Sequence, residues 1–350
     1  MNVFHSVFFR PAVTLVFPLL CLVLPAKADA GIWKSYRISG RTMGTYYHIT
    51  VASRKQVDAS LLKDKIDIRL KMINRQMSVF SPKSEISRFN RAEENKWVDI
   101  SEDFSRVVEK AEQIYRLTGG SWDGTVKPLL ELWNFGSGEK QGRMPDRKKI
   151  EKHLQITGFD KIFISEQGLL KTVPKVELDL GSIAKGFGVD AVSGLLQDSG
   201  FTRYLVEIGG EVFVSGPNAK GDKWRIGISD PSGKAEDSTP YRIVSLQDKA
   251  LATSGTYRNF VQINGRTFSH IIDPRTGRPV DNRVVSASVA AADCTFADGL
   301  ATALMVMDID KGLELVNRLE NTECLIIRKN EAGGLTPFFS SNFRSLCRTD

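Results

Sequence analysis

Apolar residues recur at helical spacing in one set of segments and at strand-like spacing in another. A residue every three or four positions marks the buried face of a helix, whereas strict alternation marks a half-buried strand. Helices are expected over residues 60–77, 101–118, 126–132, 146–154, 183–197, 297–307 and 312–319, with Ser101 capping the second. Strands are expected within 34–53 around a turn at Gly44, and over 161–165, 175–180, 204–208, 211–216, 224–228, 241–246, 259–263, 267–272, 286–290 and 323–328. Hairpins with helices grouped apart from them predict an α+β fold with mixed or antiparallel sheets.

The first 30 residues have a different pattern. Arg10 precedes an apolar run that ends at Leu24, and small residues flank Asp29 at the end of the segment. This three-part layout is typical of a secretory signal, and the run is too short for a comfortable membrane span. We therefore expect a cleavable signal peptide over residues 1–30, a single domain over residues 31–350 and a periplasmic location.

The amino-acid composition is typical of a globular protein and indicates little more about function. Charged residues make up 25% of the chain, and the net charge of +7 is spread along it, so no nucleic-acid patch is expected. The polar, Gly-rich segment 137–143 is expected to be a mobile loop. Three cysteines remain after the signal, Cys294, Cys324 and Cys347; they allow one bridge, and the sequence does not choose the pair.

An acidic residue interrupts the most apolar of the predicted helices. Asp298 and Thr302 are four positions apart, which places a carboxylate and a hydroxyl on one face. Two oxygen donors of this kind suit Mg²⁺. The alternative is structural: Asp298 caps the helix and Thr302 bonds back to a carbonyl. From this segment alone the structural interpretation is favoured.

The segment 176–190 is the next candidate for chemistry. A predicted strand ends at Asp179 and runs through a Gly turn into a helix that begins near Lys185. Free N–H groups at such a helix start, together with a lysine, favour an anion. The glycine spacing fits neither a Walker A loop nor a dinucleotide fingerprint, and glycines that pack helix on sheet are the simpler explanation.

A histidine near a turn and a hydroxyl-rich loop form another pair of candidates. His270 lies at the end of a predicted strand, just before the turn at Asp273, and can serve as a general base. Ser254 suggests a triad with these two, but the nucleophile elbow is missing. Hydroxyls around a phosphate site fit better, with Arg258 as a further phosphate contact.

Methionine, phenylalanine and tryptophan side chains occur in segments that could bind a flat ring. Met43 and Phe80 each lie in a segment that pairs methionine with small residues, and such surfaces suit a tricyclic ring, although each alone reads as core. In residues 119–126, Asp123 could accept a hydrogen bond from a heterocycle N–H.

Taken together and in order, these segments resemble the ApbE family of FAD:protein FMN transferases. The matching residues are 42–45, 77–80, 87–90, 125–129 with 132–136, 179–186, 207–211, 253–255, 270–274 and 297–303. The resemblance extends over nearly all of the chain after residue 30. Each motif is weak alone, but their shared order is specific.

The resemblance implies an ApbE-like fold and a defined reaction. Such enzymes cleave FAD, transfer FMN to a Ser or Thr hydroxyl of a partner protein and release AMP. The family's metal positions match Asp298, Thr302 and the carbonyl of Ser182. Its FAD-binding positions match Met43, Phe80, Ser121, Trp122, Asp123, Asp179, Lys185 and Ile272. His270 is the expected catalytic base, and Mg²⁺ the expected metal.

Two other functions remain open at this stage. The same site would suit a periplasmic FAD pyrophosphatase that uses water as the nucleophile, or a non-catalytic protein that holds FAD. The family's acceptors are exported domains of membrane redox complexes that carry a Ser/Thr flavinylation motif. No convincing copy of that motif occurs in this chain, so modification of the protein by itself is not expected.

Overall fold

An eight-stranded sheet runs through the unit Trp33–Asp350. Its strand order is β1-β2-β5-β6-β9-β14-β15-β16, and each neighbouring pair is antiparallel. The strands are β1 (Lys34–Thr42), β2 (Thr45–Ser53), β5 (Tyr204–Ile208), β6 (Glu211–Ser215), β9 (Lys249–Gly255), β14 (Val284–Ala291), β15 (Glu323–Lys329) and β16 (Leu335–Phe339). The predicted α+β class is confirmed.

The structure is a computed structural model that describes residues 1, 32–135, 144–232, 239–256, 260–263 and 266–347. The expected signal peptide, the 137–143 loop and Arg258 lie outside the described residues, apart from Met1. No helix in the described ranges has the length and apolarity needed to cross a membrane.

Helices and short hairpins complete the unit. The helices are α1 (Ala59–Met77), α2 (Glu85–Arg91), α3 (Glu102–Leu117), α4 (Lys127–Leu132), α5 (Arg147–Leu154), the 3₁₀ turn η1 (Phe159–Lys161), α6 (Ala184–Asp198), α7 (Cys294–Val306), α8 (Ile309–Asn317) and α9 (Phe343–Leu346). The hairpins pair β3 (Ile162–Ser165) with β4 (Gly168–Lys171), β7 (Trp224–Ile228) with β8 (Arg242–Leu246), β10 (Phe260–Ile263) with β11 (Arg266–Ser269), and β12 (Ile272–Asp273) with β13 (Arg278–Pro279).

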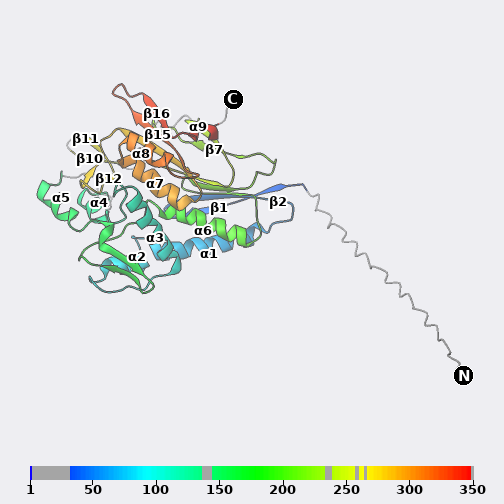
Figure 1. Cartoon of the computed structure of the whole chain (residues 1–350), viewed down its shortest axis with the longest axis horizontal. Helices are drawn as coiled ribbons and strands as arrows, with labels where there is room; N and C mark the ends of the chain where they lie inside the picture. Colours follow the sequence, from blue (N-terminus) through cyan, green and yellow to red (C-terminus); the bar gives the residue numbers. More distant parts are fainter. Residues whose placement is uncertain (2–31, 136–143, 233–238, 257–259, 264–265, 348–350) are drawn as a thin grey trace. The chain divides into compact units, whose positions relative to one another are not determined.

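The sheet has a different cover on each face. Figure 1 shows α1, α6 and α7 on one side, where they contact the sheet, and α3 packs on α7. The β7–β8 hairpin and α9 cover part of the other side, over a separate apolar cluster that includes Val214, Trp224 and Phe343. The candidate site forms on the helical side, next to the N-terminal end of α6 and the middle of α7.

Side chains at the helix starts explain where the main helices begin. Asp58 accepts hydrogen bonds from the backbone N–H groups of Ser60 and Leu61 at the start of α1, and Ser101 accepts one from Phe104 in α3. These contacts satisfy amide groups that have no partner within the helix. The predicted Ser101 cap is therefore confirmed.

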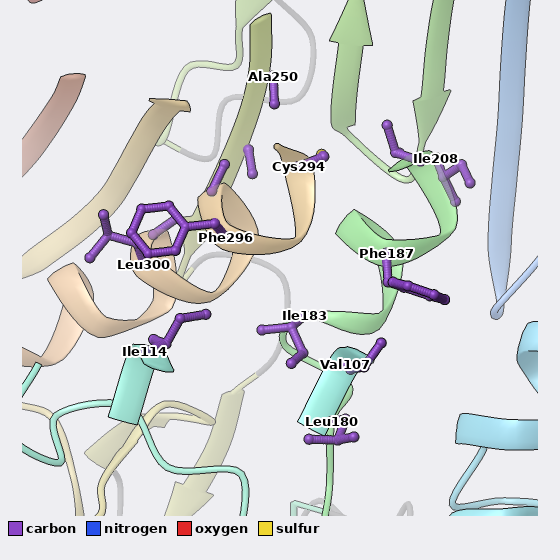
Figure 2. Packing of buried hydrophobic residues seen from close by; sticks show 14 of the residues in the cluster. Val107, Ile114, Leu180, Ile183, Phe187, Ile208, Ala250, Cys294, Phe296 and Leu300 are labelled. Carbon is purple, nitrogen blue, oxygen red and sulfur yellow. The ribbon is translucent and has the colours of Figure 1, made fainter. Parts of the chain in front are cut away.

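Gly186 allows α6 to lie close to α7, and Gly299 allows α3 to lie close to α7. A Cβ at Gly186 would stand 2.3 Å from the carbonyl oxygen of Cys294, and one at Gly299 would stand 2.5 Å from Ile114. Figure 2 shows the apolar side chains that meet between α3, α6 and α7, Ile183 and Leu300 among them. Only glycine permits these approaches, and the first brings the polar residues of α6 and α7 together.

The structure corrects two of the predicted strands. Residues 176–180 pair with no strand, and Lys175 before them has a positive φ of 65°. Instead, the side chain of Asn90 hydrogen-bonds both the N–H and the C=O of Leu178. The predicted strand 267–272 is broken between β11 and β12, so His270 lies in a bend and not on a strand. The elements α2, α9, η1, β4, β9, β13 and β16 were not predicted from the sequence. Cys294, Cys324 and Cys347 are free thiols.

Candidate active site

A cleft of about 410 Å³ opens where the N-terminal end of α6, the middle of α7 and the loops around residues 121–126 and 270–274 come together. Its volume lies within the range of small-molecule sites. Ten of the predicted site residues line it: Ser121, Trp122, Asp123, Asp179, Ser182, Lys185, His270, Ile272, Asp298 and Thr302. Residues from separate parts of the sequence thus share one cavity.

Asp298 is the buried acidic group of this cleft. It is 2% exposed and lies inside α7, whose N-cap is Asp293. The interpretation of Asp298 as a helix cap is therefore wrong. Its Oδ2 accepts a hydrogen bond from the N–H of Gly186 at 3.0 Å and lies 3.6 Å from Nζ of Lys185. Burial raises the pKa of Asp298, and these two partners oppose the rise.

Thr302 lies one turn further along α7. Its hydroxyl is 2.8 Å from the hydroxyl of Ser254 on β9, and 3.4 Å from the carbonyl oxygen of Asp298. The back-bond of the structural interpretation is therefore present. Because both side chains line the cleft, α7 presents a carboxylate and a hydroxyl to the same space.

The loop before α6 forms another part of the cleft wall. The indole N–H of Trp122 donates to Oγ of Ser182 at 2.9 Å, and the N–H of Gly181 donates to the carboxylate of Asp179 at 2.8 Å. These bonds hold the loop in a defined shape. Burial raises the pKa of Asp179, and the Gly181 hydrogen bond opposes the rise.

Glu211 is a site residue that the sequence analysis did not select. It is 3% exposed, begins β6 directly after a two-glycine turn and lines the cleft. Its Oε1 is 3.4 Å from Nζ of Lys185. Burial raises the pKa of Glu211, the charge of Asp298 adds to this rise and Lys185 opposes it. A carboxylate placed after a Gly-Gly turn was the available signal.

Lys185 stands between the two buried carboxylates. Burial by itself would lower the pKa of its ammonium, but Asp298 and Glu211 outweigh burial and raise that pKa above its ordinary value. The lysine therefore carries a positive charge at the floor of the cleft. A phosphate group that entered the cleft would meet this charge.

Asp123 belongs to a dense hydrogen-bond network. Its Oδ1 accepts from the N–H and hydroxyl of Thr125 at 2.8 Å and 2.6 Å, and its Oδ2 accepts from the N–H of Phe159 at 3.2 Å. Burial raises the pKa of Asp123 to about 6, which these hydrogen bonds oppose. Both oxygens already have partners within the protein, so its predicted bond to a heterocycle would be an additional one.

We expect the Asp123→Asn variant to change the pH dependence of stability. The pKa of Asp123 is about 6 in the folded protein, against an ordinary value of 3.8 for an aspartate, so the folded state holds the proton more tightly. The associated stabilisation is present below pH 4 and disappears as the pH rises through 6. Between pH 4 and pH 7 the wild type should lose on the order of 2 kcal/mol of unfolding free energy relative to the variant. Denaturant unfolding at a series of pH values measures this; parallel pH profiles would contradict it.

His270 lines the cleft, but Asp273, the carboxylate that a triad would require, is held by another residue. Both carboxylate oxygens of Asp273 accept hydrogen bonds from the guanidinium of Arg275, at 2.9 Å each. Asp273 also begins a turn, since its carbonyl accepts from the N–H of Gly277. Ser254 in turn is bonded to Thr302. The Ser254–His270–Asp273 triad is therefore not formed, and Asp273 acts in the turn.

A family model described as ApbE family matches residues 43–326. A FAD:protein FMN transferase of Vibrio cholerae is 39% identical over 308 residues, which cover 88% of this chain and 91% of that protein. The chain belongs to the ApbE family.

Solved structures of ApbE proteins agree with this assignment. Flavin transferase ApbE from Vibrio cholerae superposes with a TM-score of 0.81 at 39% identity, covering 90% of this chain and 99% of that one. The apo form of Pseudomonas stutzeri flavinyl transferase ApbE gives 0.81 at 31% identity, covering 91% and 98%. The predicted ApbE-like fold is confirmed. The prediction that the chain is a transferase is confirmed as well.

Two residues that the resemblance to ApbE enzymes selected lie outside the lining of the cleft. Met43 has a positive φ of 49° in the turn between β1 and β2, and it lies near Gly188, one turn along α6 from Lys185. Phe80 is 87% exposed on the surface. Their roles as FAD contacts stay predictions.

Proposed function

We propose that this protein cleaves FAD and transfers its FMN half to a Ser or Thr hydroxyl of an acceptor protein, with release of AMP. The observation that carries the proposal is the convergence of a buried carboxylate, a lysine and a histidine in one cleft. The buried hydroxyl of Ser121 in the same cleft has no hydrogen-bond partner among the described residues. A buried polar group of this kind favours a site that receives a polar ligand.

The residues around Asp298 fit Mg²⁺. Asp298 and Thr302 offer a carboxylate and a hydroxyl, and Ser182 lines the same cleft; these are hard oxygen donors. The described residues contain no group of three or more His, Cys, Asp or Glu arranged for a metal ion. We therefore infer a cation held by few protein ligands, with water and substrate phosphates completing its shell. Mg²⁺ bound there would neutralise charge on the pyrophosphate.

The protein's own groups have separate tasks in the reaction. The hydroxyl oxygen of the acceptor attacks the phosphorus of the FMN half, and the bond to the bridging oxygen breaks, so that AMP leaves. His270 takes the hydroxyl proton, and Lys185 holds a phosphate oxygen by charge. Positioning and charge neutralisation supply most of the rate in phosphoryl transfer, and the cleft provides both.

The location and the acceptor belong to the same proposal. The signal-like sequence of residues 1–30 supports export to the periplasm, with removal of this segment as a signal peptide. The acceptor is then an exported domain, which we take to be part of a membrane redox complex with a Ser/Thr flavinylation motif. Detection of the mature N-terminus in the periplasmic fraction tests the location.

One incubation separates the proposed transferase from the two alternatives. Purified protein, FAD and Mg²⁺ are mixed with or without an acceptor domain, and protein-bound flavin, free FMN and AMP are measured. We expect covalent flavin on the acceptor with one AMP released per flavin, and none when the acceptor Ser or Thr is changed to Ala. Free FMN without acceptor would indicate a pyrophosphatase, and binding without cleavage a carrier of FAD.

A further inference from the structure

Glu211 is a buried carboxylate with an unused acceptor. One of its oxygens, Oε2, is buried and has no hydrogen-bond partner among the described residues. The other, Oε1, lies 3.4 Å from Nζ of Lys185. An unpaired polar atom in a buried position destabilises the folded state. A purely structural role for Glu211 would not explain why a carboxylate is present there.

The position of Lys185 suggests what the second carboxylate does. Its ammonium lies 3.4 Å from Glu211 and 3.6 Å from Asp298, whereas a paired ammonium and carboxylate usually approach to about 2.7–2.9 Å. An ammonium is a compact charge on a flexible stem. With Asp298 as its only acidic neighbour it would move onto that carboxylate and occupy the oxygen that a cation needs.

We propose that Glu211 is a positioning residue that holds the ammonium of Lys185 away from Asp298. Asp298 then stays open to a divalent cation, and Lys185 stays at the cleft floor for a phosphate oxygen. The turn through Gly209 supports this arrangement, because a Cβ at Gly209 would stand 3.3 Å from Cδ of Lys185. The inference rests on the cation site of the proposed function.

Binding of Mn²⁺, followed by electron paramagnetic resonance, tests the inference without any turnover. Glu211→Gln keeps the size of the side chain and removes its charge. We expect it to weaken Mn²⁺ binding by about 10- to 100-fold, the usual effect of losing a partner outside the ligand shell. Glu211→Asp keeps the charge and should weaken binding less. Thermal unfolding without metal shows that each variant folds.

Glu207→Gln is the matched control. This carboxylate lies at the other end of the same turn, where it accepts a hydrogen bond from Gly210, and it does not line the cleft. The control should bind Mn²⁺ like the wild type. Equal loss in both variants would mean that the turn, and not the charge of Glu211, is responsible, and would overturn the inference.

A double-mutant cycle with Lys185→Met decides how Glu211 acts. If Glu211 works through the lysine, Glu211→Gln should change Mn²⁺ affinity by no more than about two-fold in the Lys185→Met background. A full effect in that background would show that Glu211 attracts the cation directly, and would overturn the inference. A wild type that binds no Mn²⁺ would overturn it together with the cation site, whereas FMN transfer to the acceptor is judged by its own assay.

Discussion

Asp298→Ala should abolish most FMN transfer while the protein stays folded. Asp298 is the cleft carboxylate of the proposed cation site, and it is 2% exposed. Loss of a direct ligand should lower the rate by more than the roughly 10- to 100-fold that loss of an outer partner costs. Transfer of flavin to an acceptor under saturating FAD and Mg²⁺ measures the effect.

Stability and metal dependence separate this result from misfolding. Asp298→Ala leaves Lys185 beside Glu211, so the buried ammonium keeps an acidic neighbour and the metal-free variant should still unfold cooperatively on heating. EDTA should inactivate the wild type reversibly. Thr302→Val should be milder, because water can replace a hydroxyl ligand, and Asp310→Ala on the exposed surface of α8 is the control. Full transfer by Asp298→Ala, or transfer that resists EDTA, would return this residue to a structural role.

His270→Ala or His270→Asn should slow transfer by about 10²-fold or more, the scale expected for loss of a general base. His270 lines the cleft between β11 and β12, and the proposed role concerns the acceptor proton and not the binding of FAD. FAD affinity, followed by flavin fluorescence, should therefore change little. Single-turnover transfer measures the chemical step.

The remaining histidines provide the control for this prediction. His153 lies on α5 and bonds to the carbonyl of Lys149, away from the cleft lining, so His153→Ala should transfer flavin at the wild-type rate. Transfer by His270→Ala within a few-fold of wild type at neutral pH would place the base elsewhere, or show that none is required.

The elements with strong periodicity were predictable because their pattern is local. The apolar positions of α1, from Leu62 to Ile73, follow helical spacing and are buried as expected. The strand predicted over residues 175–180 was wrong for a related reason. Their pattern favours a strand, but a strand also needs a neighbour, and here the side chain of Asn90 takes that place. Its partner lies far along the chain, where local spacing carries no information.

The candidate site was predictable to the extent that its motifs are short. The Asp298–Thr302 spacing and the loop before Lys185 each indicated oxygen ligands or an anion, and the order of the motifs indicated the family. The pairing of Asp273 with Arg275 was not visible from sequence, since Asp273 suits either a triad or a turn. Only the geometry decided between them.

The sequence alone was enough to predict the α+β class, the family and ten of the residues that line the cleft. Tertiary structure alone decided that Glu211 belongs to the cleft and that Lys185 stands between two carboxylates. The physical reason is that these groups come from three separate elements, α6, α7 and β6. Gly186 has no side chain, so α6 and α7 can approach closely enough for their polar residues to meet. Contacts of that kind depend on how distant segments pack, and no spacing along the chain encodes them.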